Sequence, residues 1–427
     1  MSRRRGAIPG ALLALVTAAA LASGPWPGSP TAHARELWRE GDRVLSLRTS
    51  LTSTLLLSRA PDDPFLFPDR DAAESFWRLR FEGEAKTGAH ATFSLAYEHR
   101  ARAVAHGEAG GLPSGILPEE APAPYRVRQL DWAITTPPGL SWRHEIDRAS
   151  VALHARRAEI TLGRQAIGWG RGVLFGAVDL FAPFSPLEAD REWRRGVDAV
   201  RADVRVSDRA SVDGVAAFAD RLDQSAFAAR LRGYAGRADG ELIVGSRARD
   251  AVAGMTGSAA VGEAEAHGEL AYFRTPDAVP GAGRGIVKGV AGASYRFGVG
   301  NGLPLFLEYH YSGFGIADAR EVLVRLQDFA YRERFLRGDS QVLARHAVAL
   351  LGTYEVSTTL TAGLTALVAP SDGSGVIEPE ATYQPGDRLS FRAILYVPFG
   401  AGPRGVTLGS FYGATPLSAY VRVRWFD

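Results

Sequence analysis

Residues 162–201 concentrate side chains that could act on a small polar molecule. Arginine stays charged in any surroundings and donates hydrogen bonds in a fixed fork, so arginines facing acids across a narrow aqueous passage can select solutes by charge. The same charges could instead pair with surrounding residues and only hold the segment in place, and the sequence leaves both roles open. The candidate residues are Arg164, Trp169, Arg171, Asp179, Arg191, Arg194 and Arg195.

A second set of charges occupies every second residue of other segments. Their signs are mixed, so opposite charges on neighbouring strands are expected to pair and keep a polar wall hydrated, with solute contact at a few positions. The candidate residues are Arg78, Arg80, Glu82, Glu263, Glu265, Glu269, Arg422 and Arg424.

Signals for catalysis or metal binding are poor. The chain has no G-x-S-x-G motif, no phosphate-binding loop and no H-E-x-x-H motif, so we expect neither enzymatic activity nor a cofactor. Glu263, Glu265, His267 and Glu269 share one strand face. However, carboxylates two residues apart on a strand lie about 7 Å apart, which is loose for a single ion. We therefore expect no metal site.

The elements that carry these charges show the two-residue period of β-strands. Trp77 and Leu79, for example, alternate with Arg78 and Arg80. The pattern recurs along the chain and predicts an all-β fold, a transmembrane antiparallel barrel of about 16 strands (14–18) with an inward-folded loop segment. Tight turns are expected near residues 156 and 384. Long connections are expected at residues 103–124, 166–196, 313–341 and 399–416.

Strands that are apolar on one face and charged on the other fit either a soluble sandwich or an outer-membrane barrel. The apolar face is rich in Ala and Gly, which would fill a sandwich core poorly. Aromatic residues near strand ends match the girdles of membrane proteins. We therefore expect the apolar face to meet lipid and the charged face to line a water-filled lumen. No linker divides residues 35–427, so we expect one barrel domain.

The start of the chain predicts export. Three arginines, a short apolar run and an A-x-A site at residues 32–34 form a secretory signal peptide, with cleavage expected after Ala34. Its removal takes three of the 49 basic residues and leaves 46 against 47 acidic ones, so net charge gives no reason to expect nucleic-acid binding. The chain has no cysteine and therefore no disulfide framework.

The last strand resembles the C-terminal strand of Gram-negative outer-membrane barrels. In that family an alternating strand ends on an aromatic residue that the barrel-assembly machinery recognises. Here Val421, Val423, Trp425 and Phe426 match the pattern. Residues 162–201 and 371–400 resemble porin-like proteins of the alginate-export type and related uncharacterised proteobacterial barrels.

The resemblance implies an outer-membrane location, contact with outer-membrane lipid and diffusion of small polar solutes through the lumen. Two alternatives remain. One is a polysaccharide-export pore, which the resemblance suggests. The other is an outer-membrane barrel enzyme of the protease or lipase type, which would need a Ser/His or Asp/His set near a loop rim.

Overall fold

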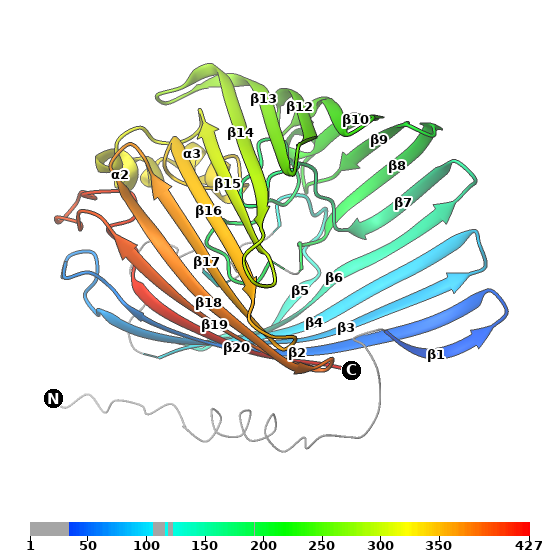
Figure 1. Ribbon diagram of the computed structural model, residues 1–427, viewed down its shortest axis with the longest axis horizontal. Coiled ribbons are helices and arrows are strands. Elements are labelled where there is room, and N and C mark those ends of the chain that lie inside the picture. The colour runs from blue at the N-terminus through cyan, green and yellow to red at the C-terminus, as the bar shows by residue number, and fades with distance from the viewer. Residues whose placement is uncertain (1–33, 106–115, 118–122, 192) are drawn as a thin grey trace.

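The computed structural model describes residues 34–105, 116–117, 123–191 and 193–427. The expected signal peptide lies outside the described residues except for Ala34. The described chain forms one antiparallel sheet that curves into a closed barrel (Figure 1). Within these ranges, no helix has the length and apolar character needed to cross a membrane.

Eighteen strands form the closed wall, which lies within the predicted range. They are β2 (Arg43–Arg59), β3 (Asp71–Thr87), β4 (Ala91–Ala105), β6 (Leu140–His154), β7 (Ala158–Gln165), β8 (Val197–Ser207), β9 (Ala210–Ala217), β10 (Ala226–Ala235), β11 (Ala238–Arg247), β12 (Asp250–Val261), β13 (Ala264–Val279), β14 (Gly283–Phe297), β15 (Leu303–Ser312), β16 (His346–Glu355), β17 (Leu360–Ala369), β18 (Ser374–Gly386), β19 (Leu389–Phe399) and β20 (Leu417–Phe426).

The ring closes between its first and last strands. β20 pairs with β19 on one edge and with β2 on the other, in a register that runs from Ser50 opposite Phe426 to Arg59 opposite Leu417. This pairing satisfies backbone groups that an open sheet edge would expose to hydrocarbon.

Two short strands extend the wall without adding a position to the ring. β1 (Arg35–Glu40) pairs with the start of β2, on the edge that β20 occupies further along. β5 (Asp131–Thr135) pairs with the first half of β6, on the edge that β7 occupies further along. β7 and β5 therefore share one position in the wall.

Side chains alternate between the outer face and the lumen. On β20, Val421 is 47% exposed on the outer face, whereas Arg422 and Arg424 are buried inside the barrel. On β2, Leu55 opposite Val421 is exposed, and Thr54 opposite Arg422 is buried. The prediction that apolar residues turn outward and arginines inward is confirmed on these strands.

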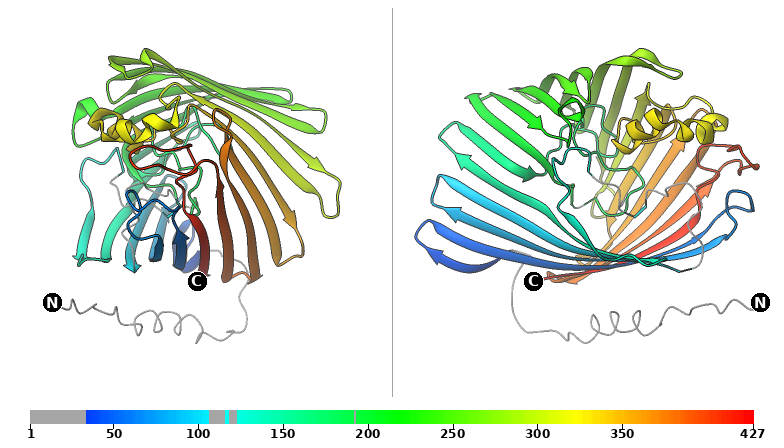
Figure 2. Two further views of the ribbon diagram at one scale, coloured as in Figure 1. Left: turned by 90° about the vertical axis from the view of Figure 1, so that its left-hand side faces the viewer. Right: turned by 180° about the vertical axis from the view of Figure 1, so that it is seen from behind.

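The two ends of the barrel carry different connections. At one end, the short-turn end, tight turns such as residues 88–90 and 155–157 join the strands. The other end, the long-loop end, carries the connections between β4 and β6, β7 and β8, β15 and β16, and β19 and β20 (Figure 2). These are the four long connections expected from the sequence. The helical elements are η1 (Leu222–Gln224), η2 (Ala319–Glu321), α2 (Val322–Gln327) and α3 (Phe329–Leu336).

Candidate functional site

The connection between β7 and β8, residues 166–196, folds into the barrel (Figures 1 and 2). We call it the lumen loop. Its residues Ile167, Phe175, Leu180 and Phe181 are at most 1% exposed. Burial against the wall explains why a connection of this length is so apolar, since a loop in water would expose these side chains. The prediction of an inward-folded segment is confirmed.

The first half of the lumen loop is held through its backbone. Every N–H group of residues 171–178 donates a hydrogen bond to a side chain outside the loop, at N···O distances up to 3.2 Å. Two of the three acceptors are wall carboxylates, Glu269 on β13 and Glu308 on β15, which we call the carboxylate cradle. Glu269 accepts from Arg171, Gly172, Ala177 and Val178, Glu308 accepts from Val173, Leu174 and Phe175, and Gln341 accepts from Gly176.

The same part of the lumen loop packs directly on the wall. Phe175 stacks on the ring of His310, with ring centroids 4.9 Å apart and planes at 24°. A Cβ atom placed on Gly254 of β12 would lie 3.1 Å from Val178 Cγ1, so the glycine permits a close approach. The lumen loop therefore covers the wall formed by β12, β13 and β15.

The second half of the lumen loop reaches the opposite wall through Asp190. Its carboxylate lies 3.0 Å from Arg78 on β3, and 3.3 and 3.6 Å from Arg424 and Arg422 on β20. Burial raises the pKa of Asp190, but the three guanidinium groups more than offset this and leave the pKa below its ordinary value. The lumen loop thus spans the barrel interior from β13 and β15 to β3 and β20.

Two further candidate residues fix the start of the lumen loop. Arg164, on β7, pairs with Asp198 at 2.7 Å and donates to two backbone carbonyl oxygens. Trp169 is buried, with the Arg230 guanidinium 4.8 Å from its ring centroid and the ring of Phe181 edge-on at 5.1 Å. These contacts join the start of the lumen loop to β8 and β10 and to the rest of the loop.

The other charged candidates of the loop also find partners. Arg171 pairs with Asp239 on β11 at 2.6 Å, and Arg194 pairs with Asp179 within the loop at 2.5 Å. Burial raises the pKa of Asp179 even though Arg194 opposes this shift. Arg191 donates to carbonyl oxygens of the lumen loop itself.

The charged wall residues pair across neighbouring strands. Arg80 of β3 is fully buried and bonds to Glu98 on β4 and Asp147 on β6, the latter at 2.9 Å. Arg80 also pairs with Glu82 at 2.8 Å on its own strand, and Arg48 lies 3.7 Å from Glu82. The ion-pair network therefore runs across β2, β3, β4 and β6.

The glutamates near β13 separate into two groups. Glu269 belongs to the carboxylate cradle, whereas Glu265 is exposed. Glu263 lies in the turn before β13, is exposed and accepts a hydrogen bond from Tyr295 at 3.0 Å. In the part of the chain that the structure describes, no three His, Cys, Asp or Glu side chains come together as a metal site.

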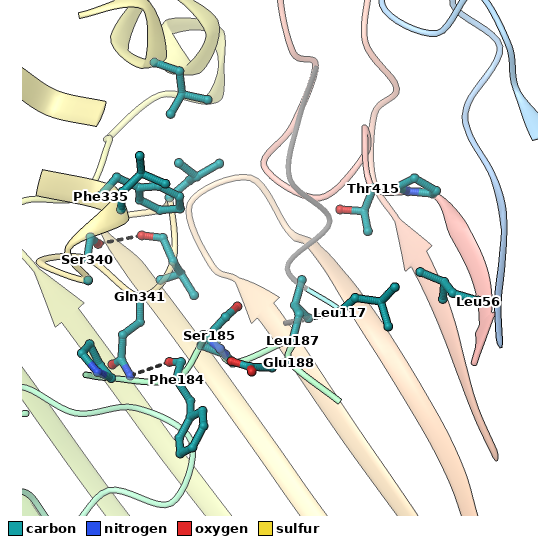
Figure 3. A pocket seen from close by; sticks show the side chains of 18 of the residues that line it. Leu56, Leu117, Phe184, Ser185, Leu187, Glu188, Phe335, Ser340, Gln341 and Thr415 are labelled. Atoms are coloured by element: carbon teal, nitrogen blue, oxygen red, sulfur yellow. Dashed lines mark hydrogen bonds between the residues drawn. The ribbon is translucent and has the colours of Figure 1, made fainter. Parts of the chain in front are cut away.

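A cavity of about 470 Å³ lies between the lumen loop and strands β2, β3, β4 and β6 (Figure 3). Its other boundaries come from residues 335–344 and from residues 408–416 at the long-loop end. Apolar side chains such as Leu187 and Phe335 line it beside a charged group. The charged lining includes Arg78, Glu98, Arg100, Glu145, Asp147, Glu188 and Arg195.

Two titratable groups of the lumen loop line this cavity. Burial, helped by the negative charge of Asp190, raises the pKa of Glu188 to about 7. Burial, with the positive charges of Arg126 and Arg100 nearby, lowers the pKa of Arg195 to about 10. Of the two, Glu188 can therefore change its charge near neutral pH.

Sequence reasoning did not single out Glu308, Asp190, Asp147 or Gln341 as site residues. Asp147 was hidden by a β-bulge: Ala96 pairs with Arg148 while the next residue of β4 pairs with Ile146. Asp147 is thus the extra residue, which breaks the two-residue period. Asp190 could have been found as an acid within an arginine-rich run.

Neither a protein-family model nor a curated protein sequence matches this chain. Solved structures do. OccAB1 of Acinetobacter baumannii is 9% identical with a TM-score of 0.56, covering 94% of this chain and 99% of that one. OccAB3 of the same organism is 10% identical with a TM-score of 0.53, covering 90% and 99%. OccK11 (OpdR) of Pseudomonas aeruginosa is 10% identical with a TM-score of 0.50, covering 89% and 95%.

Identities this low carry information on fold rather than on substrate. The similarity extends over almost the whole length of both chains, so it concerns the complete barrel and not one hairpin. The chain has the porin-like fold, a closed antiparallel barrel of eighteen strands with a loop folded into its lumen.

Proposed function

We propose that this protein is a channel of the Gram-negative outer membrane through which small polar solutes diffuse. One observation carries the proposal: a closed barrel with an apolar outer face encloses a charged cavity of about 470 Å³ beside a loop that spans the lumen. A lipid-facing exterior around a polar interior is the arrangement of outer-membrane channels.

The solute path runs between the lumen loop and the wall of β2, β3, β4 and β6. Two observations support this side. The cavity lies here, and the opposite wall is covered by residues 171–178. We assign selectivity to the charges of the cavity lining, above all Arg78, Arg195 and Glu188. Arg164, Asp179 and Arg194 hold the lumen loop in position.

The proposal also covers how the protein is exported and assembled. Residues 1–34 act as a signal peptide, and the barrel-assembly machinery recognises β20 through Val423, Trp425 and Phe426. The alternative of a barrel enzyme would need a Ser/His or Asp/His set near a loop rim.

Planar-bilayer recording of the purified mature chain tests the proposal. We expect discrete open levels with salts, and uptake of small sugars by liposomes that carry the protein. A chain that inserts but stays silent, and that hydrolyses a peptide or lipid ester, would contradict it. Deleting residues 169–186 should raise the single-channel conductance, since the lumen loop then no longer spans the lumen.

A further inference from the structure

The carboxylate cradle differs from the ion-pair networks on the opposite wall. Glu269 and Glu308 are 5% and 0% exposed. Among the described residues, neither lies within ion-pairing distance of an arginine or lysine, and only His267 approaches, 2.9 Å from Glu308. In contrast, Arg80 and Asp190 sit in networks of ion pairs. Seven backbone N–H groups of the lumen loop donate to the two carboxylates. The buried side chain of Lys288 on β14 also attracts Glu269, from beyond ion-pairing distance.

Only a carboxylate at these two positions can accept all of these N–H hydrogen bonds. A buried carboxylate needs donors, and successive N–H groups in a concave loop supply them as strong, charge-assisted hydrogen bonds. The loop needs the carboxylates equally, because residues 171–178 have no helical or strand partner for these N–H groups. A glutamine would turn one acceptor oxygen into an NH₂ group facing N–H donors.

The two ends of the lumen loop are therefore held by different forces. The Asp190 end depends on buried guanidinium–carboxylate pairs, and one of the partners, Arg78, also lines the cavity. The cradle end depends on hydrogen bonds buried between the loop and the wall, which salt reaches poorly. Small, buried wall residues lie beside the cradle: Ala271 is two residues from Glu269 on β13, and Ala349 pairs with Glu308. That half of the lumen would be free if residues 171–178 moved away.

We infer that Glu269 and Glu308 are the positioning residues that set the width of the channel, by fixing residues 171–178 over the β12–β15 wall and closing half of the lumen. Both carboxylates touch only the lumen loop and the wall, so they act on passage through the position of the loop. The inference rests on the proposed function for its conductance readout. Its accessibility readout does not need the channel to conduct.

The test combines Glu269→Gln and Glu308→Gln in the full mature chain. The single-channel conductance should rise at least about twofold, because the cross-section open to ions grows. A control is Asp208→Asn, which removes a negative charge at an exposed position in the turn between β8 and β9 and should leave conductance unchanged.

The accessibility of the wall beneath residues 171–178 is measured in parallel. The chain has no cysteine, so Ala271→Cys provides a single thiol on the wall, close to the loop residue Val178. The thiol should be protected from a membrane-impermeant maleimide when the cradle is intact and labelled in the double variant. Labelling of a non-conducting protein would support the inference and overturn the proposed function. Unchanged conductance with a protected thiol would overturn the inference.

A second variant acts from the loop side in case the double variant does not fold. A Cβ atom on Gly172 would lie 1.8 Å from the carbonyl oxygen of Phe175, so Gly172→Ala must displace the loop while leaving the wall unaltered. Heat-dependent gel mobility confirms that the barrel is folded. Gly172→Ala should also raise conductance and expose the thiol, and a folded variant with wild-type values in both measurements would contradict the inference.

Discussion

At the scale of single residues, charge balance separates the two ends of the lumen loop. Asp190 faces Arg78, Arg422 and Arg424, all of them buried, and Arg78 also lies 3.6 Å from Glu98, so Asp190 offsets part of a positively charged group. Removing one partner of a buried ion pair leaves a buried charge uncompensated. The resulting loss of folding stability exceeds the stability that the pair itself contributes. Asp190 therefore joins the lumen loop to β3 and β20 through these ion pairs.

Replacing Asp190 with Asn should make the channel more selective for anions. Three guanidinium groups then lose the carboxylate that they share, and we expect the ratio of anion to cation permeability to rise roughly twofold or more. Reversal potentials in a salt gradient measure this ratio. Asp223→Asn, at an exposed rim position in η1, is the control. A shift toward cations in Asp190→Asn would contradict the proposed path.

Glu188 should make selectivity depend on pH. With its pKa raised to about 7, Glu188 is neutral at pH 6 and negative at pH 8, so cation selectivity should increase as the pH rises across this window. Glu188→Gln should abolish this pH dependence and keep, at every pH, the selectivity that the wild type shows at pH 6. Reversal potentials at pH 6, 7 and 8 would test this, and an equal pH response in wild type and variant would refute the assignment.

At the scale of elements, the strands could be predicted from the sequence and the contacts of the loop could not. Alternation on β3 and β20 placed Arg78, Arg80, Arg422 and Arg424 inside, because a half-buried strand imposes its period on the chain. An inward-folded loop segment was also predicted. The carboxylate cradle could not be predicted, because it joins backbone N–H groups of the loop to Glu269 and Glu308, which lie on strands far along the chain.

A charge on the outer face of β20 should destabilise the barrel according to depth. Val421 lies in the middle of β20 and faces outward, so Val421→Arg should cost about 2–4 kcal/mol of unfolding free energy in lipid. Leu417→Arg, at the end of the same strand and also facing outward, should cost about 0–1 kcal/mol. Denaturant titration in bilayers measures both values, and equal costs would contradict a membrane-embedded β20.

At the scale of the whole molecule, the barrel reverses the usual distribution of polar and apolar residues. Large apolar side chains such as Leu95, Leu242 and Leu395 are at least half exposed on the outer face, while arginines such as Arg80 and Arg247 are fully buried. This surface is stable only against lipid or detergent, because contiguous exposed apolar area drives association in water.

The purified mature chain should therefore be monodisperse in detergent and aggregate when the detergent is removed. Light scattering before and after dilution below the critical micelle concentration provides the measurement. A monodisperse monomer in plain buffer would refute the membrane barrel and, with it, the channel.

β1 and β20 meet β2 on one edge, and this has a consequence for chain connectivity. Arg35 pairs with Leu47 and Phe426 pairs with Ser50, so the two partner positions are about 10 Å apart along β2. A short linker could join Asp427 to Arg35, and a new break within residues 88–90 would give a circular permutant that keeps every strand pairing. Such a permutant would begin at β4 and finish with β3. Its insertion rate, compared with that of the natural order, would reveal whether assembly depends on which strand arrives last.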